Sequence, residues 1–407
     1  MFQIGIGMKR RPPNVRVICD TGLGYFRNIV LGARHYAFTS GNMVIQDRWE
    51  DVPPKNLDLW VSQNGIDGIV AQVNTLKFEE QLMALSIPVV NVANILPNPR
   101  LPTVTQDDLS VGRMAAEHLG ECRCAALACW GIAGAIFSQD RIRGFAAEAA
   151  THCHVMEGSG IGSESGEPLI ARMVAWLKPL PRPLGVFSVM DVFAVHMLKA
   201  IHRLGWRVRQ DVVVLGAGNE EFLVQYETPP ISSVELPSRQ IGYEAAAMLH
   251  SCMMGRERHP HAFMTFGPMG VASRQSTDIV FMDDPAVARA LDFIRSRRTG
   301  AISVGEITRA AELSRIPLQR RFKERLGRTI RQEVQRSRIE LAKSLLRSSE
   351  ETIGWVAQRC RFPSSQRFAV VFRKQTGLSP GQFRKTAHPA SGKGPVAGEN
   401  HSSGSLD

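Results

Sequence analysis

Short apolar runs alternate with longer amphipathic segments over the first two thirds of the chain. The apolar runs have the length and the Val and Ile content of buried strands, and they lie at residues 15–19, 43–45, 68–71, 88–92, 125–129, 185–189 and 212–216. Apolar residues recur at helical spacing between them, at residues 25–39, 79–85, 109–119, 141–150, 169–177 and 192–204. Such alternation is typical of parallel sheets that helices cover on both faces. The number of units predicts two α/β lobes.

The strand pattern stops at the sequence MDDP, residues 282–285. There Asp284 can cap a helix, and Pro285 suits its first position. From this junction to residue 388 the pattern is helical throughout. We therefore expect an N-terminal segment (1–14), a two-lobed effector-binding domain (15–278), an all-α domain (285–388) and a tail (389–407). The tail is rich in Gly, Ser, Pro and Asn, a composition typical of disorder.

The all-α domain contains two similar pairs of helices. In the first pair, Ser303 and Glu306 form a capping box, and Ser314 can cap the helix that follows after a tight turn. In the second pair, Thr352 and Ser364 can cap the two helices. A long helix over residues 331–347 joins the pairs. The pattern predicts two helix-turn-helix units on one connecting helix.

Charge is distributed unevenly along the chain. Residues 285–388 contain 23 basic and eight acidic side chains, a net charge of +15, whereas the remaining residues contain 26 basic and 30 acidic side chains, a net charge of −4. A basic end on a neutral-to-acidic body is typical of a domain that binds a polyanion. We expect double-stranded DNA, contacted in the major groove. The alternative is a basic helical bundle that binds protein.

The second helix of each pair must present polar and basic side chains near its N-terminus to reach base edges. Arg and Gln can each hold a purine edge with two hydrogen bonds, whereas the other basic side chains suit phosphates. The candidates in the first unit are Arg315, Gln319 and Arg320. Those in the second unit are Ser365, Gln366, Arg367, Arg373 and Lys374.

Catalytic and metal-binding motifs are missing from the sequence. The GxG at Gly22 and Gly24 follows the first strand, but Arg27 stands at the third glycine position of a dinucleotide fingerprint. The seven cysteines are scattered, which indicates buried thiols in a reducing compartment. We expect no enzyme activity, no cofactor and no metal. An α/β enzyme with a fused helical domain remains the alternative.

Targeting signals are also missing from the sequence. Residues 1–13 lack the apolar run of a signal peptide, and no apolar stretch is long enough to span a membrane. We expect a cytoplasmic, nucleoid-associated protein with no membrane contact.

A two-lobed α/β body binds small molecules at the carboxyl ends of its strands. A sugar in such a crevice requires planar polar groups and an aromatic face. Four residues at predicted strand ends meet this requirement, namely Tyr25, Arg141, Asp191 and Asn219. Each could instead make a structural salt bridge or cap, and Tyr25 could lie in the core.

The whole of the all-α domain resembles the AraC/XylS family of transcription regulators. The matching motifs are LQRRFKERLG (318–327), RIELAKSLL (338–346), SSQRF (364–368) and FRKQTGLSP (372–380). The resemblance implies base contacts at Ile316, Gln319 and Arg320, and at residues 365–367. The family commonly has glycine in both turns, where this chain has Glu312 and Arg361. Each would cost on the order of 1 kcal/mol if the left-handed conformation is kept.

The two-lobed domain resembles the sugar-sensing domain of LacI-type repressors and periplasmic sugar-binding proteins. The matching motifs are DRIRGF (140–145), VMD (189–191), LGAGNEE (215–221), ISSV (231–234) and GYEAA (242–246). The order of the two domains is similar to that of xylose-operon regulators. This chain departs from the LacI-type pattern at Gly218, where an aspartate is common, and Phe26 stands where a xylose regulator has an acidic residue.

These resemblances imply a DNA-binding regulator controlled by a small sugar-like effector. They favour activation of transcription by a homodimer, with RNA polymerase as a candidate further partner. The alternatives are a constitutive DNA-binding regulator with a non-functional sensor, and a solute-binding protein.

Overall fold

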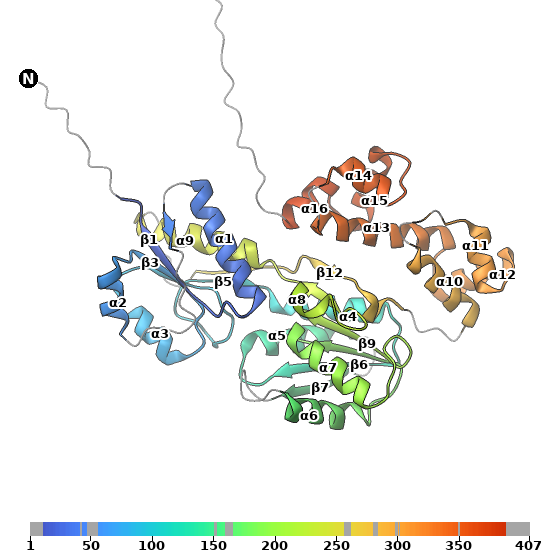
Figure 1. The fold of residues 1–407 in the computed structure, drawn as a ribbon, viewed down its shortest axis with the longest axis horizontal. Coiled ribbons are helices and arrows are strands. Elements are labelled where there is room, and N and C mark those ends of the chain that lie inside the picture. Colours follow the sequence, from blue (N-terminus) through green and yellow to red (C-terminus); the bar gives the residue numbers. More distant parts are fainter. Residues whose placement is uncertain are drawn as a thin grey trace, which may run out of the picture.

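The computed structural model describes residues 11–40, 43–46, 56–149, 153–158, 166–255, 262–279, 284–297, 300, 302–348 and 351–387. The predicted tail (389–407), most of the N-terminal segment (1–14) and residues 282–283 of the junction lie outside these ranges. The described residues form two α/β lobes and a helical domain (Figure 1). No helix among them is long and apolar enough to cross a membrane.

The first lobe is built on a six-stranded parallel sheet in the order β11-β5-β4-β3-β1-β2. Its strands are β1 (Asn14–Ile18), β2 (Val44–Ile45), β3 (Gly68–Ala71), β4 (Val89–Asn91), β5 (Thr103–Gln106) and β11 (Phe263–Phe266). Alternate residues of a strand point to opposite faces, so Val15 and Val17 pack against helices α1 (Gly24–Ser40) and α9 (Ser238–Met253). Ile18 packs on the other face with α2 (Leu57–Asn64) and α3 (Leu76–Met83). The predicted parallel sheet with helices on both faces is confirmed.

The second lobe has a six-stranded sheet in the order β12-β10-β9-β8-β6-β7. Its strands are β6 (Ala126–Ile132), β7 (Cys153–Gly158), β8 (Leu184–Ser188), β9 (Val212–Ala217), β10 (Ser232–Glu235) and β12 (Gly270–Ala272). Helices α4 (Asp108–Gly120) and α5 (Ile136–Glu148) cover one face, and α6 (Glu167–Leu177) and α7 (Asp191–Arg203) cover the other. The short helix α8 (Glu221–Val224) follows β9. β12 pairs with β10 in the antiparallel direction, which corrects the expectation of wholly parallel sheets.

The two lobes are not consecutive in sequence. The chain passes from the first lobe to the second between β5 and α4, returns between β10 and α9, and crosses again between β11 and β12. The 3₁₀ turn η1 (Gln275–Thr277) then leads toward the helical domain. The sequence pattern predicted neither α9 nor the late strands β11 and β12. The two strands escaped notice because they are only four and three residues long and are partly exposed.

The helical domain consists of α10 (Pro285–Ser296), α11 (Val304–Ala311), α12 (Arg315–Leu326), α13 (Ile330–Ser348), α14 (Ile353–Arg359), α15 (Ser365–Thr376) and α16 (Pro380–Ala387). It has two separate apolar cores. One contains Leu291, Ile307 and Phe322, and the other contains Val356 and Phe368. Helix α13 contributes to both cores, so the two predicted helix-turn-helix units are joined as expected (Figure 1).

The helix caps follow the sequence signals closely. Asp284 accepts hydrogen bonds from the first-turn amides of α10, Ser303 and Glu306 form the capping box, and Thr352 and Ser364 cap α14 and α15. Ser314 occupies the N-cap position of α12 but makes no side-chain capping bond.

Both turns keep the left-handed conformation that glycine usually supplies. The φ angle is 51° at Glu312 and 60° at Arg361. Glu312 gains a partial compensation, because its carboxylate lies 3.3 Å from Arg289, which also donates to the carbonyl oxygen of Ala311.

Candidate effector site and nucleic-acid interface

A cavity of about 620 Å³ lies between the two lobes, at the carboxyl ends of their strands. Its wall combines apolar and polar side chains from both lobes. The apolar residues include Ile18, Leu23, Phe26, Phe78, Ile95, Phe137, Met190 and Leu236, and the polar residues include Asp20, Tyr25, Gln72, Asn74, Asn94, Gln106, Arg141, Asp191 and Glu220. The volume suits a small organic molecule.

Arg141 lies in the wall of this cavity and is almost completely buried. Its Nε donates to Asp108 Oδ1 at 2.8 Å, and its Nη1 donates to the carbonyl oxygen of Val189 at 2.5 Å. The guanidinium carbon is 5.1 Å from the centre of the Phe137 ring. The ion pair and the ring hold the planar guanidinium in one orientation toward the cavity.

Asp108, at the start of α4, collects the polar side chains around Arg141. Its carboxylate also accepts from Asn94 Nδ2 at 2.9 Å and from Gln106 Nε2 at 3.0 Å. Burial raises the pKa of this carboxyl, whereas the neighbouring Arg141 and the hydrogen bonds lower it. Tyr25 donates its hydroxyl hydrogen bond to Gln106 Oε1, so the predicted Tyr25 and Arg141 belong to one network. Burial raises the pKa of the Tyr25 hydroxyl well above its usual value, which keeps it protonated.

Asp191 lies on the same cavity, as its position after β8 predicts. Its Oδ1 accepts from the Ser233 hydroxyl at 2.5 Å, and its Oδ2 accepts from the backbone amide of Glu220 at 2.8 Å. Burial raises the pKa of Asp191 to about 6. The carboxylate therefore both faces the cavity and fixes the loop that carries Glu220.

Asn219 is not among the residues that line the cavity. Its side chain donates to Glu235 at 3.0 Å and accepts from Arg274 at 2.7 Å. The structure thus brings Tyr25, Arg141 and Asp191 together and turns Asn219 away. The neighbouring Gly218 has a φ of 128°, and a Cβ there would lie 3.2 Å from Asp191, which accounts for glycine at this position.

Sequence reasoning missed several residues of this wall. Gln106 is the last residue of β5, a strand of four residues that the apolar pattern did not reveal, and it bonds to Asp108, which does not itself line the cavity. Asn94 lies three residues after the end of β4, and Glu220 adjoins the predicted Asn219. The available signal was the cluster of amide and carboxylate side chains immediately after each strand.

The nine predicted DNA contacts are all exposed, with the sensor lobes present. Arg315, Ile316, Gln319 and Arg320 lie on α12, and Ile316 is 79% exposed. Ser365, Gln366, Arg367, Arg373 and Lys374 lie on α15. The second helix of each pair, α12 or α15, is the reading helix of its helix-turn-helix unit, the one that would enter the major groove. An isoleucine so exposed on such a helix suits apolar contact with a base, such as a thymine methyl group.

Helix α13 sets the separation of the two reading helices. It has 19 residues, which corresponds to about 28 Å at 1.5 Å per residue. One turn of B-DNA is about 34 Å long, so two units held at the ends of such a helix can face successive major grooves.

Among the residues that the structure describes, no group of three or more His, Cys, Asp or Glu side chains could hold a metal ion. The described cysteines carry free thiols.

Two family models match the chain. Residues 97–277 match a periplasmic binding protein-like domain, and residues 307–386 match a helix-turn-helix domain. The first segment covers the second lobe and the later part of the first, without β1 to β4 and α1 to α3, and the second segment covers the two helix-turn-helix units from within α11 onward.

Curated relatives cover both domains together. The xylose operon regulatory protein of Haemophilus influenzae is 30% identical over 80% of this chain and 86% of its own length. The xylose operon regulatory protein of Escherichia coli K12 is 30% identical over 91% of this chain and 96% of its own length.

A solved structure of the xylose-binding transcription activator XylR matches 93% of this chain and 99% of its own, with 28% identity and a TM-score of 0.58. The agreement confirms the predicted architecture of a two-lobed sensor followed by a helix-turn-helix domain. The relatives are transcription regulators, so the prediction that the chain is not an enzyme is also confirmed.

Proposed function

Because the chain belongs to the family of xylose operon regulatory proteins, and is thus a transcription regulator with a helix-turn-helix DNA-binding domain, we propose that it activates transcription in response to a small sugar. The active form is a homodimer in the cytoplasm that binds two DNA half-sites and contacts RNA polymerase. The effector binds in the cavity between the two lobes, and the DNA lies against α12 and α15.

The observation that carries the sugar assignment is the set of cavity-lining side chains that bond to the buried Asp108. Arg141, Asn94 and Gln106 present planar donors and acceptors, and Phe137 adds an aromatic face beside them. Sugar hydroxyls both donate and accept hydrogen bonds, and the C–H face of the ring packs on aromatic side chains. Tyr25, Arg141 and Asp191 are the proposed effector contacts, whereas Asn219 supports the loop beside them.

The DNA contacts proposed for this chain are the exposed side chains of the two reading helices. Gln319, Arg320, Gln366 and Arg367 are proposed to read base edges, because they lie on the exposed faces of α12 and α15 and can form paired hydrogen bonds. Arg373 and Lys374 lie further along α15 and are proposed to contact phosphates.

The sensor is tested by thermal denaturation of the full-length protein with D-xylose, other pentoses, hexoses and sugar acids. A true effector raises the melting temperature, because it binds only the folded state. Asp191→Ala should abolish this increase and leave binding to DNA unchanged. No shift with any sugar would favour the alternative of a constitutive regulator.

The DNA assignment is tested by selection of binding sites from a random duplex pool with the same protein. Two recurring sequence elements one helical turn apart, one for each helix-turn-helix unit, are expected within the half-site of each bound domain. Recovery of unrelated sequences would refute base reading by α12 and α15.

A further inference from the structure

Helix α4 runs from the effector cavity to the DNA-binding domain. It has 13 residues, about 20 Å at 1.5 Å per residue, and its first residue is the buried Asp108. Glu121 follows its last residue and forms an ion pair with Arg336 of α13. One rigid element thus contacts both functional regions of the chain.

At the cavity end of α4, residues of both lobes form hydrogen bonds with the same side chain. Asp108 accepts hydrogen bonds from Arg141 of the second lobe and from Asn94 of the first. The carbonyl oxygen of Asn94 in turn accepts from the backbone amide of Phe137 at 2.8 Å. Because Arg141 and Asn94 both line the cavity, a molecule that bonds to either of them competes for the donors that Asp108 holds.

Helices α4 and α5 behave as one body, because their backbones are in contact. A Cβ at Gly112 of α4 would lie 2.0 Å from the carbonyl oxygen of Arg141, and a Cβ at Gly144 of α5 would lie 2.1 Å from that of Leu109. Only glycine permits this approach, so a shift of Arg141 with α5 is also a shift of α4.

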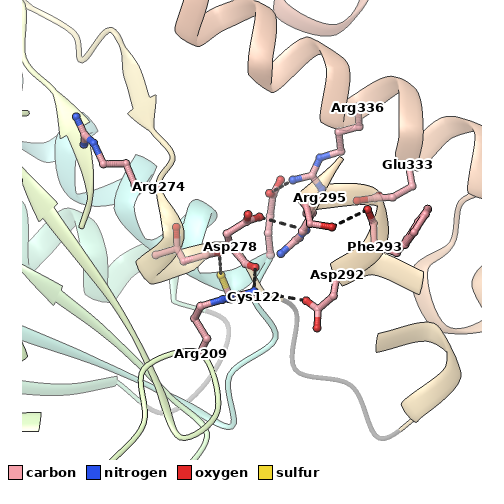
Figure 2. A network of polar contacts seen from close by, with 12 residues as sticks. Cys122, Arg209, Arg274, Asp278, Asp292, Phe293, Arg295, Glu333 and Arg336 are labelled. Atoms are coloured by element: carbon pink, nitrogen blue, oxygen red, sulfur yellow. Dashed lines mark hydrogen bonds and ion pairs between the residues drawn. The ribbon is translucent and has the colours of Figure 1, made fainter. Parts of the chain in front are cut away.

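The far end of α4 lies in a polar junction with the helical domain (Figure 2). His118 bonds to the Thr277 hydroxyl at 2.8 Å, and burial lowers the pKa of His118 to about 4, so the ring is neutral at pH 7. The thiol of Cys122 donates to the carbonyl oxygen of Thr277 at 3.5 Å. The end of α4 is therefore fixed to η1, the last described turn of the sensor before the gap at residues 280–283.

Ion pairs carry the contact between the two domains. Besides Glu121 and Arg336, Asp278 lies 3.7 Å from Arg295 of α10, and Arg209 lies 3.8 Å from Asp292. A cavity of about 220 Å³ lies between the surfaces, with Arg295, Arg336 and Glu121 in its wall. An interface held by ion pairs around a cavity allows relative motion of two domains more easily than a large hydrophobic interface does.

We propose that α4 transmits the state of the effector cavity to the DNA-binding domain. A change in the hydrogen bonds that Asp108 accepts moves α4 together with α5, and this motion makes or breaks the Glu121–Arg336 ion pair that holds α13 against the sensor. Since α13 joins both helix-turn-helix units, its position relative to the sensor sets the positions of α12 and α15 together. The regulatory meaning of the signal rests on the proposed function, whereas the link between the two ends of α4 does not.

Hydrogen–deuterium exchange of the full-length protein, measured in the absence of sugar and DNA, tests this link. Glu121→Gln removes the charge at the far end of α4, and we expect amide exchange to rise about threefold or more in the first half of α13. Arg336→Gln removes the other partner and should give the same result, so misfolding of one variant does not decide the outcome. The control is Glu167→Gln, which breaks the ion pair with Arg203 between α6 and α7 and should leave amide exchange in α13 unchanged.

Transmission is tested by Asn94→Ala, which removes a donor to Asp108 at the opposite end of α4. We expect it to change exchange in α13 when Glu121 is intact and to have no further effect in Glu121→Gln. An unchanged α13 in Asn94→Ala, or an equal effect in both backgrounds, would overturn the proposal. Sugar and DNA binding, measured separately on the same proteins, would show whether the proposed function itself fails.

Discussion

The backbone amide of Gly24 in the first lobe donates a 3.0 Å hydrogen bond to Oε2 of Glu220 in the second lobe. Arg27, one turn further along α1, forms an ion pair with the other oxygen of the same carboxylate. Arg27 also donates at 2.8 Å to the carbonyl oxygens of Thr21 and Gly22, which holds its side chain across the loop. The two lobes are therefore joined at the rim of the cavity by a carboxylate at the N-terminus of α1, where the helix dipole favours negative charge.

Glu220→Gln should weaken the bridge between the lobes and so favour a more open arrangement than the one in this structure. The amide can still accept from Gly24 but loses the ion pair with Arg27, which is 46% exposed and so worth about 0.2–1 kcal/mol. This energy corresponds to about a 1.4- to fivefold change in the ratio of open to closed molecules. Distance measurements between spin labels on the two lobes would detect it. Glu221→Gln, at the exposed next residue, should leave the distances unchanged; an equal change there would refute the bridge.

Arg320→Ala should relax the base preference of the first unit. A paired contact with a guanine edge contributes about 1–3 kcal/mol of discrimination, and this amount should be lost at the selected site. Binding titrations on selected and random duplexes measure the difference. Arg325→Ala, on the same helix but near its C-terminus, should reduce the affinity for both duplexes equally. An equal loss for Arg320→Ala on both duplexes would show that it binds phosphate.

Glu312→Gly should stabilise the DNA-binding domain. A non-glycine residue at a φ of 51° costs on the order of 1 kcal/mol, which glycine does not incur. The lost ion pair with Arg289 offsets part of the gain, because Glu312 is 75% exposed. Thermal denaturation should show a higher melting temperature for the helical domain.

Arg361→Gly is the matched change in the second turn, where φ is 60°. A lower melting temperature in both variants would mean that the turns carry no strain.

Asp191 should make the stability of the sensor depend on pH. Its pKa is raised from 3.8 to about 6 by burial, so the folded protein binds this proton more tightly than the unfolded chain does. The contribution of Asp191 to the free energy of unfolding is therefore greatest below about pH 4 and falls as the pH rises to about 6.

The Asp191→Asn variant tests this dependence. Denaturant titrations of the wild type and of the variant across this range should differ in slope, by up to about 3 kcal/mol in total. Parallel pH profiles would contradict the assignment.

The sequence predicted most of the helical domain because its signals are local. Ser303 and Glu306 lie three residues apart, and Thr352 and Ser364 each cap the helix that follows them, so a single sequence reveals them. Strand–helix alternation likewise predicted both lobes. Asp191 could be placed on the cavity because it follows the carboxyl end of β8, and Arg141 because it lies on the helix that follows β6.

The remainder depends on contacts between distant parts of the chain. Asp108 gains its role from Asn94 and Arg141, which lie 14 and 33 residues away in sequence. Glu220 bridges the lobes through Gly24 and Arg27, 196 and 193 residues earlier. Asn219 resembled a cavity residue in sequence, yet Glu235 and Arg274 hold its side chain elsewhere. The spacing of apolar residues along the sequence does not reveal contacts between distant residues. For this reason the contact between α4 and α13 at the domain junction was not predicted.

The interleaved order of the two lobes has a consequence for synthesis on the ribosome. Helix α1 packs against α9, and β5 pairs with β11, so the first lobe lacks part of its core and one edge strand until residue 266 has been translated. The second lobe acquires β12 only a few residues later. The nascent sensor must therefore remain incomplete, with the apolar side of α1 unpaired, for most of its elongation. Its two halves then mature nearly together, just before the helix-turn-helix units emerge.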